Sequence, residues 1–125
     1  MTKRIRVLVA DNRPRARQSM KALLTAWSEV EEVCEAASGR EAVGLVEAFQ
    51  PDVVLIDVRM PEMDGLEATQ LIKAKWPQVK VIALSMYVEY ETAAMAAGAD
   101  AFVAKGDLAR KLRTIVVDVT RDIKT

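Results

Sequence analysis

The chain has 125 residues, of which 51% are hydrophobic and 29% are charged, and its 18 lysines and arginines balance its 18 aspartates and glutamates. This composition is typical of one globular domain, and the zero net charge gives no argument for direct contact with nucleic acid. The absence of histidine, together with a single cysteine, Cys34, excludes a zinc site, a Cys-His pair and a Ser-His-Asp triad. No apolar stretch approaches the roughly 18 residues that span a bilayer, so we expect a cytoplasmic protein without membrane contact.

Short apolar runs that predict strands alternate along the chain with stretches of helical periodicity. The strand candidates are residues 5–10, 33–37, 53–56, 79–84 and 101–104. The first helix is expected to begin at Pro14. Its buried face is predicted to contain Ala16, Met20, Leu23, Leu24 and Trp27. The second helix opens with Ser38 and Glu41, which have the spacing of a capping box, and it ends before Pro51.

The remaining helices are predicted over residues 66–75 and 88–97 and from Leu108 onward, with Gly98 as a left-handed cap after the fourth. The buried face of the fifth is predicted to contain Leu108, Leu112, Ile115, Val116, Val119 and Ile123. Parallel neighbours need helical crossovers, so this alternation favours an α/β fold. We expect residues 1–125 to form one flavodoxin-like (βα)5 domain, a doubly wound parallel sheet with strand order 2-1-3-4-5.

Polar residues follow four of the five predicted strands, where the carboxyl ends of parallel strands form a ligand-binding edge. They are Asp11 and Asn12, Asp57, Ser85 and Lys105. Each alone has an ordinary structural explanation as a helix cap, a turn residue or a solvated amine. As a group they match phosphoryl transfer to a carboxylate, because aspartates bind hard cations, one carboxylate can attack phosphorus, and a hydroxyl and an amine can hold phosphoryl oxygens.

Over essentially its whole length the chain resembles the receiver domain of two-component response regulators. The segments that carry the resemblance are 9–12, 55–65, 83–85 and 98–106. The resemblance implies that a sensor histidine kinase phosphorylates Asp57 and that Mg²⁺, or Mn²⁺, binds to Asp11, Asp57 and the backbone carbonyl of Arg59. It also implies that Ser85 and Lys105 hold phosphoryl oxygens. Phe102 matches the aromatic residue that turns inward when the domain switches.

The same resemblance implies that phosphorylation alters the surface formed by residues 87–98 and 101–120, with homodimerisation as one consequence. Tyr87, Tyr90 and Met95 are candidate contact residues on that surface. Arg59, Met86 and Tyr87 are expected to set the rate of hydrolysis by shielding Asp57 from water. The domain is not expected to be an enzyme beyond its own phosphorylation and slow autodephosphorylation.

Two positions depart from the usual receiver pattern. Asn12 occupies the place of a second acidic residue that normally contacts the metal, which predicts weak Mg²⁺ binding. Gly106 follows Lys105 where many receivers have a proline, and receivers joined to LuxR-type helix-turn-helix output domains often lack that proline. We therefore expect an output module outside these 125 residues, a DNA-binding domain being one candidate.

Two other functions fit parts of the pattern. A pseudo-receiver, which acts as a binding module without phosphorylation, would explain Asn12. A small phosphatase of the haloacid dehalogenase type would also use a strand-end aspartate, a hydroxyl and a lysine, but Arg59 stands where its second aspartate is expected. A nucleotide-binding domain is disfavoured because no glycine-rich turn follows the first strand.

Overall fold

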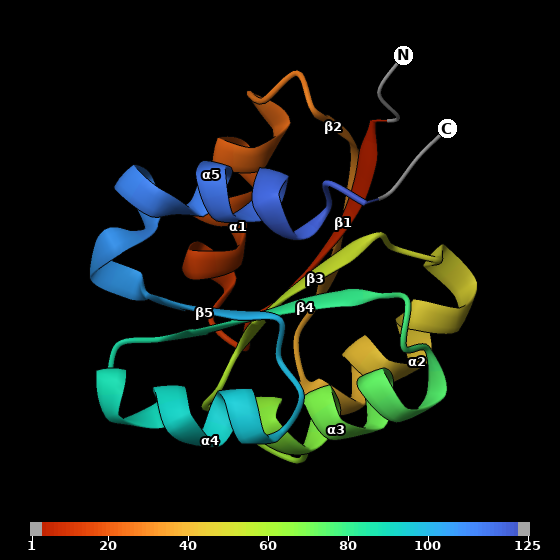
Figure 1. Cartoon of the computed structure of the whole chain (residues 1–125), viewed down its shortest axis with the longest axis vertical. Coiled ribbons are helices and arrows are strands. Elements are labelled where there is room, and N and C mark those ends of the chain that lie inside the picture. The colour runs from red at the N-terminus through yellow and green to blue at the C-terminus, as the bar shows by residue number, and fades with distance from the viewer. Residues whose placement is uncertain (1–3, 123–125) are drawn as a thin grey trace.

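A five-stranded parallel sheet lies at the centre of the computed structural model, which describes residues 4–122 (Figure 1). The strands are β1 (Ile5–Ala10), β2 (Val30–Ala36), β3 (Val53–Asp57), β4 (Lys80–Ser85) and β5 (Ala101–Ala104). Their order is β2-β1-β3-β4-β5, and each neighbouring pair is parallel. The predicted flavodoxin-like fold and strand order are therefore confirmed.

Helices cover both faces of the sheet (Figure 1). The helices α1 (Pro14–Thr25) and α5 (Leu108–Val119) pack on one face, where their apolar residues form one core with alternate residues of the strands. The helices α2 (Gly39–Phe49), α3 (Gly65–Lys75) and α4 (Glu91–Ala96) cover the other face. Two short 3₁₀ turns, η1 (Val88–Tyr90) and η2 (Lys105–Asp107), precede α4 and α5. None of the helices within residues 4–122 is both long and apolar enough to cross a membrane.

Most boundaries agree with the sequence prediction to within one residue, and two differences are larger. The strand β2 begins at Val30, three residues before the predicted start, because it is an edge strand whose outer residues Glu31 and Glu32 are exposed and carry no apolar signal. The predicted fourth helix is divided into η1 and α4. The predicted contribution of Ile123 to α5 lies outside the described residues.

Cys34 lies on β2 and is half-buried beside the core under α2. Burial raises the pKa of its thiol above the ordinary value. Cys34 therefore acts as a small packing residue beside this core.

The helix ends follow the local sequence signals. The Ser38 hydroxyl accepts a hydrogen bond from the Glu41 amide at 3.1 Å, and the Glu41 carboxylate accepts one from the amide of Ala37. After α4, Gly98 has φ +106°, and its amide donates to the Met95 carbonyl. The predicted left-handed cap is confirmed, since this conformation favours glycine.

The C-terminal end of α3 is tied to the segment that follows α4. The Lys73 ammonium donates to the carbonyls of Pro77 at 3.1 Å and Val79 at 2.9 Å and to the Asp100 carboxylate at 3.0 Å. Asp100 also accepts a hydrogen bond from the Val81 amide at 2.8 Å. These bonds use all three donors of the lysine and fix the start of β4 against the loop before β5.

The N-terminal end of α3 lies directly against the end of β3. Asp64 caps the helix by accepting a hydrogen bond from the Glu67 amide at 2.9 Å. The next residue, Gly65, donates its amide to the Val58 carbonyl at 2.8 Å. A Cβ atom at Gly65 would lie 2.2 Å from the backbone oxygen of Asp57 and 2.8 Å from the Cα of Val58. Only glycine therefore allows α3 to approach this closely.

Candidate functional site

Asp11 and Asp57 are neighbours at the carboxyl edge of the sheet. The central strands β1 and β3 pair with Ala10 opposite Ile56, which places the following two aspartates side by side. Each is only 6% exposed. Burial of two carboxylates is costly unless a positive partner compensates them.

Lys105 supplies that partner from the start of η2. Its Nζ donates to Oδ2 of Asp11 at 2.8 Å and to Oδ2 of Asp57 at 3.2 Å, and its side chain is 9% exposed. The three residues are far apart in sequence and are brought together by the order of the strands. The prediction that they converge is confirmed.

Ser85 ends β4 and is almost completely buried. Its Oγ accepts a hydrogen bond from the Tyr87 amide at 3.0 Å. Ser85 lines a pocket of about 230 Å³ that Asp57 also lines. The residues lining this pocket are Asn12, Arg13, Asp57, Arg59, Ser85, Met86 and Tyr87.

Phe102 lies away from this pocket. It is half-buried on β5 and packs against the cluster of Val58, Ala83, Ala94 and Ala99. Tyr90 and Leu66 contact the same cluster. Phe102 on β5 is therefore separated from Asp57 on β3 by the strand β4, and its switching role stays a prediction.

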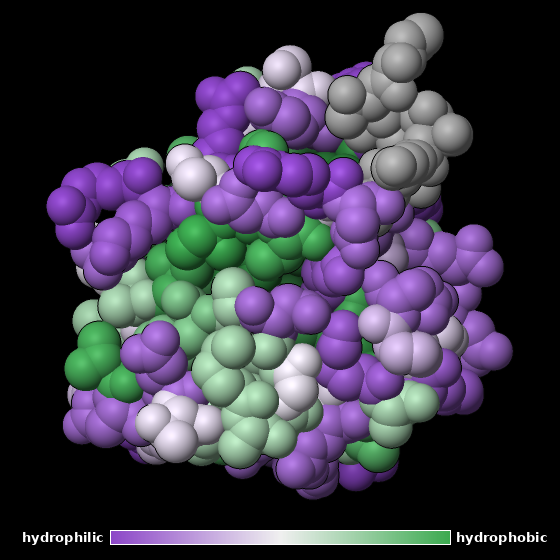
Figure 2. Space-filling model, in the orientation of Figure 1, coloured by the Kyte–Doolittle hydropathy of each residue, from purple (hydrophilic) through white to green (hydrophobic). Residues whose placement is uncertain are grey.

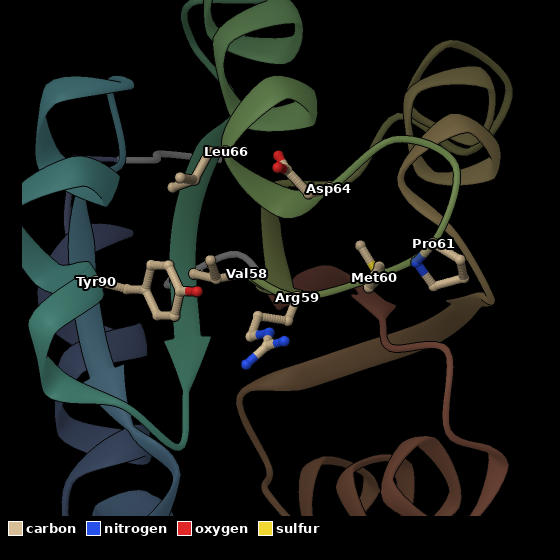
Figure 3. Close-up of a pocket in the computed structure, with 7 residues that line it drawn as sticks. All are labelled: Val58, Arg59, Met60, Pro61, Asp64, Leu66 and Tyr90. Atoms are coloured by element: carbon tan, nitrogen blue, oxygen red, sulfur yellow. The ribbon is translucent and has the colours of Figure 1, made fainter.

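Aromatic and basic side chains form the rim of the pocket. The Arg59 guanidinium lies 5.7 Å from the centre of the Tyr87 ring, and Tyr87 meets Tyr90 edge to face at 6.4 Å. Arg59 also lines a second hollow of about 430 Å³, whose other lining residues are Val58, Met60, Pro61, Asp64, Leu66 and Tyr90 (Figure 3). Met86 and Tyr87 line the pocket and are 64% and 48% exposed, so the pocket stays open to solvent beside them.

Asp11 is held by the segment that begins α1. Its Oδ1 accepts the Arg13 amide at 2.9 Å and lies 3.6 Å from the Arg13 Nε, while Arg17 donates to the Asp11 carbonyl at 2.7 Å. Asn12 is exposed beside them. The sequence prediction included Asn12 but not Arg13 or Arg17. The available signal was the position of Arg13 two residues after an aspartate, where a carboxylate accepts the backbone amide in an Asx turn.

The oxygen atoms at this edge suit a hard divalent cation. The carboxylates of Asp11 and Asp57, the amide oxygen of Asn12 and the carbonyl of Arg59 are the ligand types that Mg²⁺ prefers. Nowhere within residues 4–122 do three aspartate, glutamate, histidine or cysteine side chains converge as a metal site. This set of donors, which includes two carboxylates, fits Mg²⁺. Both oxygens of the Asp11 carboxylate already accept hydrogen bonds, Oδ1 from the Arg13 amide and Oδ2 from Lys105.

A doubly wound sheet that carries two aspartates, a hydroxyl and a lysine at its carboxyl edge is the arrangement expected of a receiver domain. The chain belongs to the response regulator receiver domain family, whose model matches residues 7–117. It is thus a receiver domain of the two-component systems, as the sequence resemblance predicted.

Individual relatives agree with this assignment. The response regulator protein VraR of Staphylococcus aureus is 35% identical over 119 residues, which cover 94% of this chain and 57% of VraR. The chain thus spans little more than half of that relative. A LuxR-family DNA-binding response regulator from S. aureus superposes with a TM-score of 0.85 at 28% identity, covering 92% of this chain and 98% of that one. The predicted likeness to LuxR-type regulators is confirmed.

A further solved structure is that of the response regulator TrrA from Thermotoga maritima in complex with Mg²⁺ and BeF. It superposes with a TM-score of 0.84 at 30% identity and covers 95% of this chain and 99% of that one.

Proposed function

We propose that this receiver domain accepts a phosphoryl group on Asp57 from the phosphohistidine of a sensor kinase, with Mg²⁺ as the assisting ion. The observation that carries the proposal is the pair of hydrogen bonds from Lys105 to Asp11 and Asp57 beside a pocket that also contains Ser85. The domain acts as a signalling module that modifies itself and loses the group slowly. It is not a turnover enzyme.

The two oxygens of Asp57 differ in their contacts. Oδ2 accepts from Lys105 at 3.2 Å, whereas Oδ1 has one long contact of 3.4 Å with the Arg59 amide. The weakly engaged Oδ1 is therefore the oxygen that attacks phosphorus. Ser85 accepts a hydrogen bond through Oγ, so its own hydroxyl proton remains available to a phosphoryl oxygen. Mg²⁺, when bound, reduces the repulsion between the carboxylate and the incoming phosphoryl group.

An aspartyl phosphate adds up to about two negative charges and several acceptor oxygens. Ser85 and Lys105 then gain a new partner, and the segment after β4 responds because the Tyr87 amide is bonded to Ser85. The surface that receives this change is made by α4, β5 and α5, where Figure 2 shows apolar residues between charged ones. Met95 and Val117 are 44% and 37% exposed there. A second phosphorylated copy or an output domain, such as a DNA-binding module, would bind to this surface.

Intact mass spectrometry after incubation with acetyl phosphate and Mg²⁺ tests the proposal. We expect the wild-type protein to gain one phosphoryl group and Asp57→Asn to gain none, because the amide is a poor nucleophile. Asp118→Asn is the matched control and should react like wild type, since this exposed carboxylate of α5 forms an ion pair with Arg121, away from the site. Equal labelling of Asp57→Asn would refute the assignment. No labelling of the wild type, even by its own kinase, would favour a pseudo-receiver.

The phosphatase alternative receives no support. Such a phosphatase requires a second aspartate at the position of Arg59. The Arg59 side chain lies over the Tyr87 ring and has no carboxyl group. The receiver family assignment also points away from it.

Asn12→Asp should strengthen Mg²⁺ binding. A unit charge about 4 Å from another is worth about 4 kcal/mol at an effective dielectric of about 20, and more for a dication, before dehydration is subtracted. We expect a net gain of about tenfold in affinity, measured from the shift of the Arg59 backbone amide during a Mg²⁺ titration. Gln18→Glu adds the same charge at an exposed position of α1 and is the control. If Asn12→Asp and wild type bind equally well, the missing charge at position 12 does not limit the site.

A further inference from the structure

The site carries more positive than negative formal charge. Arg13 and Arg59 line the pocket, and Lys105 reaches its acidic side. Against these three cations stand two carboxylates, Asp11 and Asp57, which leaves a formal charge of +1. An incoming phosphoryl dianion therefore meets a cationic pocket before any metal contributes.

Arg13 is fixed at the mouth of this pocket by its backbone. It is the N-cap residue of α1, its amide donates to Asp11, and Pro14 sets the first turn of the helix. Its Nε lies 3.6 Å from Oδ1 of Asp11, so the side chain folds toward the acidic pair. Because its side chain is 55% exposed, the guanidinium can also reach a group bound in the pocket.

Arg59 is the second arginine that lines the pocket. The 5.7 Å contact with Tyr87 is at the long end of cation–π distances and is exposed, so it holds the guanidinium only weakly. A phosphoryl group offers charge-assisted hydrogen bonds that are stronger than this contact. Asn12 also lines the pocket, and because it is neutral it does not compensate the positive charge of the two arginines.

We propose that Arg13 and Arg59 form a cationic clamp that holds the phosphoryl group on Asp57 and supplies positive charge that receivers otherwise take from a divalent metal. Phosphorylation of this domain consequently depends only weakly on Mg²⁺. This inference rests on the proposed function and specifies how the same site binds its anion.

Phosphoramidate is the probe for the test because it needs no partner protein. The lone pair of the Asp57 carboxylate oxygen forms the new P–O bond, the P–N bond breaks, and ammonia leaves with the proton that the nitrogen already carries. The total charge of the reactants, one carboxylate and one phosphoramidate monoanion, equals that of the dianionic acyl phosphate. No further reagent is required.

The experiment compares the rate of phosphoryl gain by intact mass in EDTA and in Mg²⁺. We expect the wild-type protein to be phosphorylated in EDTA at a rate within about tenfold of the Mg²⁺ rate. In Arg13→Gln both rates should fall, and the rate in EDTA should fall far more than the rate in Mg²⁺. The ratio of the Mg²⁺ rate to the EDTA rate should therefore rise by at least about tenfold. Arg59→Gln should change the ratio in the same direction. Arg15→Gln, an exposed residue of the same helix, is the control.

Two results would overturn the clamp. One is a wild-type protein that is phosphorylated in Mg²⁺ but not in EDTA. The other is an unchanged ratio in Arg13→Gln, since a merely structural role of Arg13 would lower both rates equally.

A separate measurement covers the case in which no variant is phosphorylated and the proposed function itself fails. Orthophosphate is titrated in EDTA while the Arg13 and Arg59 Nε–H signals are followed by NMR. A saturable shift of the Arg59 signal that disappears in Arg13→Gln but persists in Arg15→Gln would support the clamp as an anion site. The absence of this shift in the wild type would overturn it.

Discussion

Gly65→Ala should destabilise the domain strongly, although it adds only one methyl group. The new Cβ would lie 2.2 Å from the Asp57 carbonyl oxygen, and both this oxygen and the nearby Val58 Cα belong to the backbone. Neither can rotate away, so α3 must move from β3. Overpacking usually costs about 1–3 kcal/mol, and we expect about 3 kcal/mol or more of the unfolding free energy to be lost. Urea denaturation followed by tryptophan fluorescence and circular dichroism measures this loss.

Gly44→Ala is the matched control for the same substitution. Gly44 lies in the middle of α2, is exposed, and a Cβ there has no atom within 4 Å. Alanine should therefore stabilise the helix by about 0.5–1 kcal/mol. A Gly65→Ala variant as stable as wild type would show that α3 adjusts freely, and the close approach would then not constrain Asp57.

Lys105→Met should produce a second large loss of stability, and Mg²⁺ should restore part of it. Methionine keeps the buried length but leaves Asp11 and Asp57, each 6% exposed, without the ammonium that bridges them. Removal of one partner from a buried ion pair typically costs about 3–5 kcal/mol. A cation bound between the carboxylates replaces the missing charge, so Mg²⁺ should raise the unfolding free energy more in this variant than in wild type.

The comparison needs urea denaturation of both proteins with and without Mg²⁺. Lys111→Met serves as the control because the Lys111 side chain is 56% exposed and its ion pair with Asp107 spans 3.6 Å on the surface. It should change stability by less than about 1 kcal/mol and show no special response to Mg²⁺. If Lys105→Met responded to Mg²⁺ no more than wild type did, the two carboxylates would not form a cation site.

Most of the fold could be predicted because its signals are local. Strand β3 is a continuous apolar run that is buried on both faces, and Ser38 and Gly98 mark helix ends through their own backbone bonds. The start of β2 could not be predicted, since on an edge strand the exposed Glu31 and Glu32 are held by ion pairs with Arg6 from the neighbouring strand. Those ion pairs depend on the register between β1 and β2, which the periodicity of the β2 sequence alone does not indicate.

The same limit applies to the site. The strand ends predicted Asp11, Asp57, Ser85 and Lys105, because parallel strands bring their carboxyl ends together. Arg13 was missed because an arginine in a basic segment is usually a solvated side chain. Its role follows from the Asx turn, which sets its backbone beside Asp11. The spacing of the two residues indicates the turn, but it does not indicate that the Arg13 side chain lies near the Asp11 carboxylate.

The Lys73 tie determines how α4 can move. The C-terminal end of α4 is followed by Asp100, which is bonded to both Lys73 and the Val81 amide, whereas its N-terminal end continues from η1, which follows the Ser85–Tyr87 contact. One end of the helix is thus anchored and the other is adjacent to the site of modification. We expect α4 to behave as a lever with its pivot at Gly98, so that displacement is largest at Val88 and smallest at Met95. A binding partner that contacts the η1 end would sense the modification most strongly.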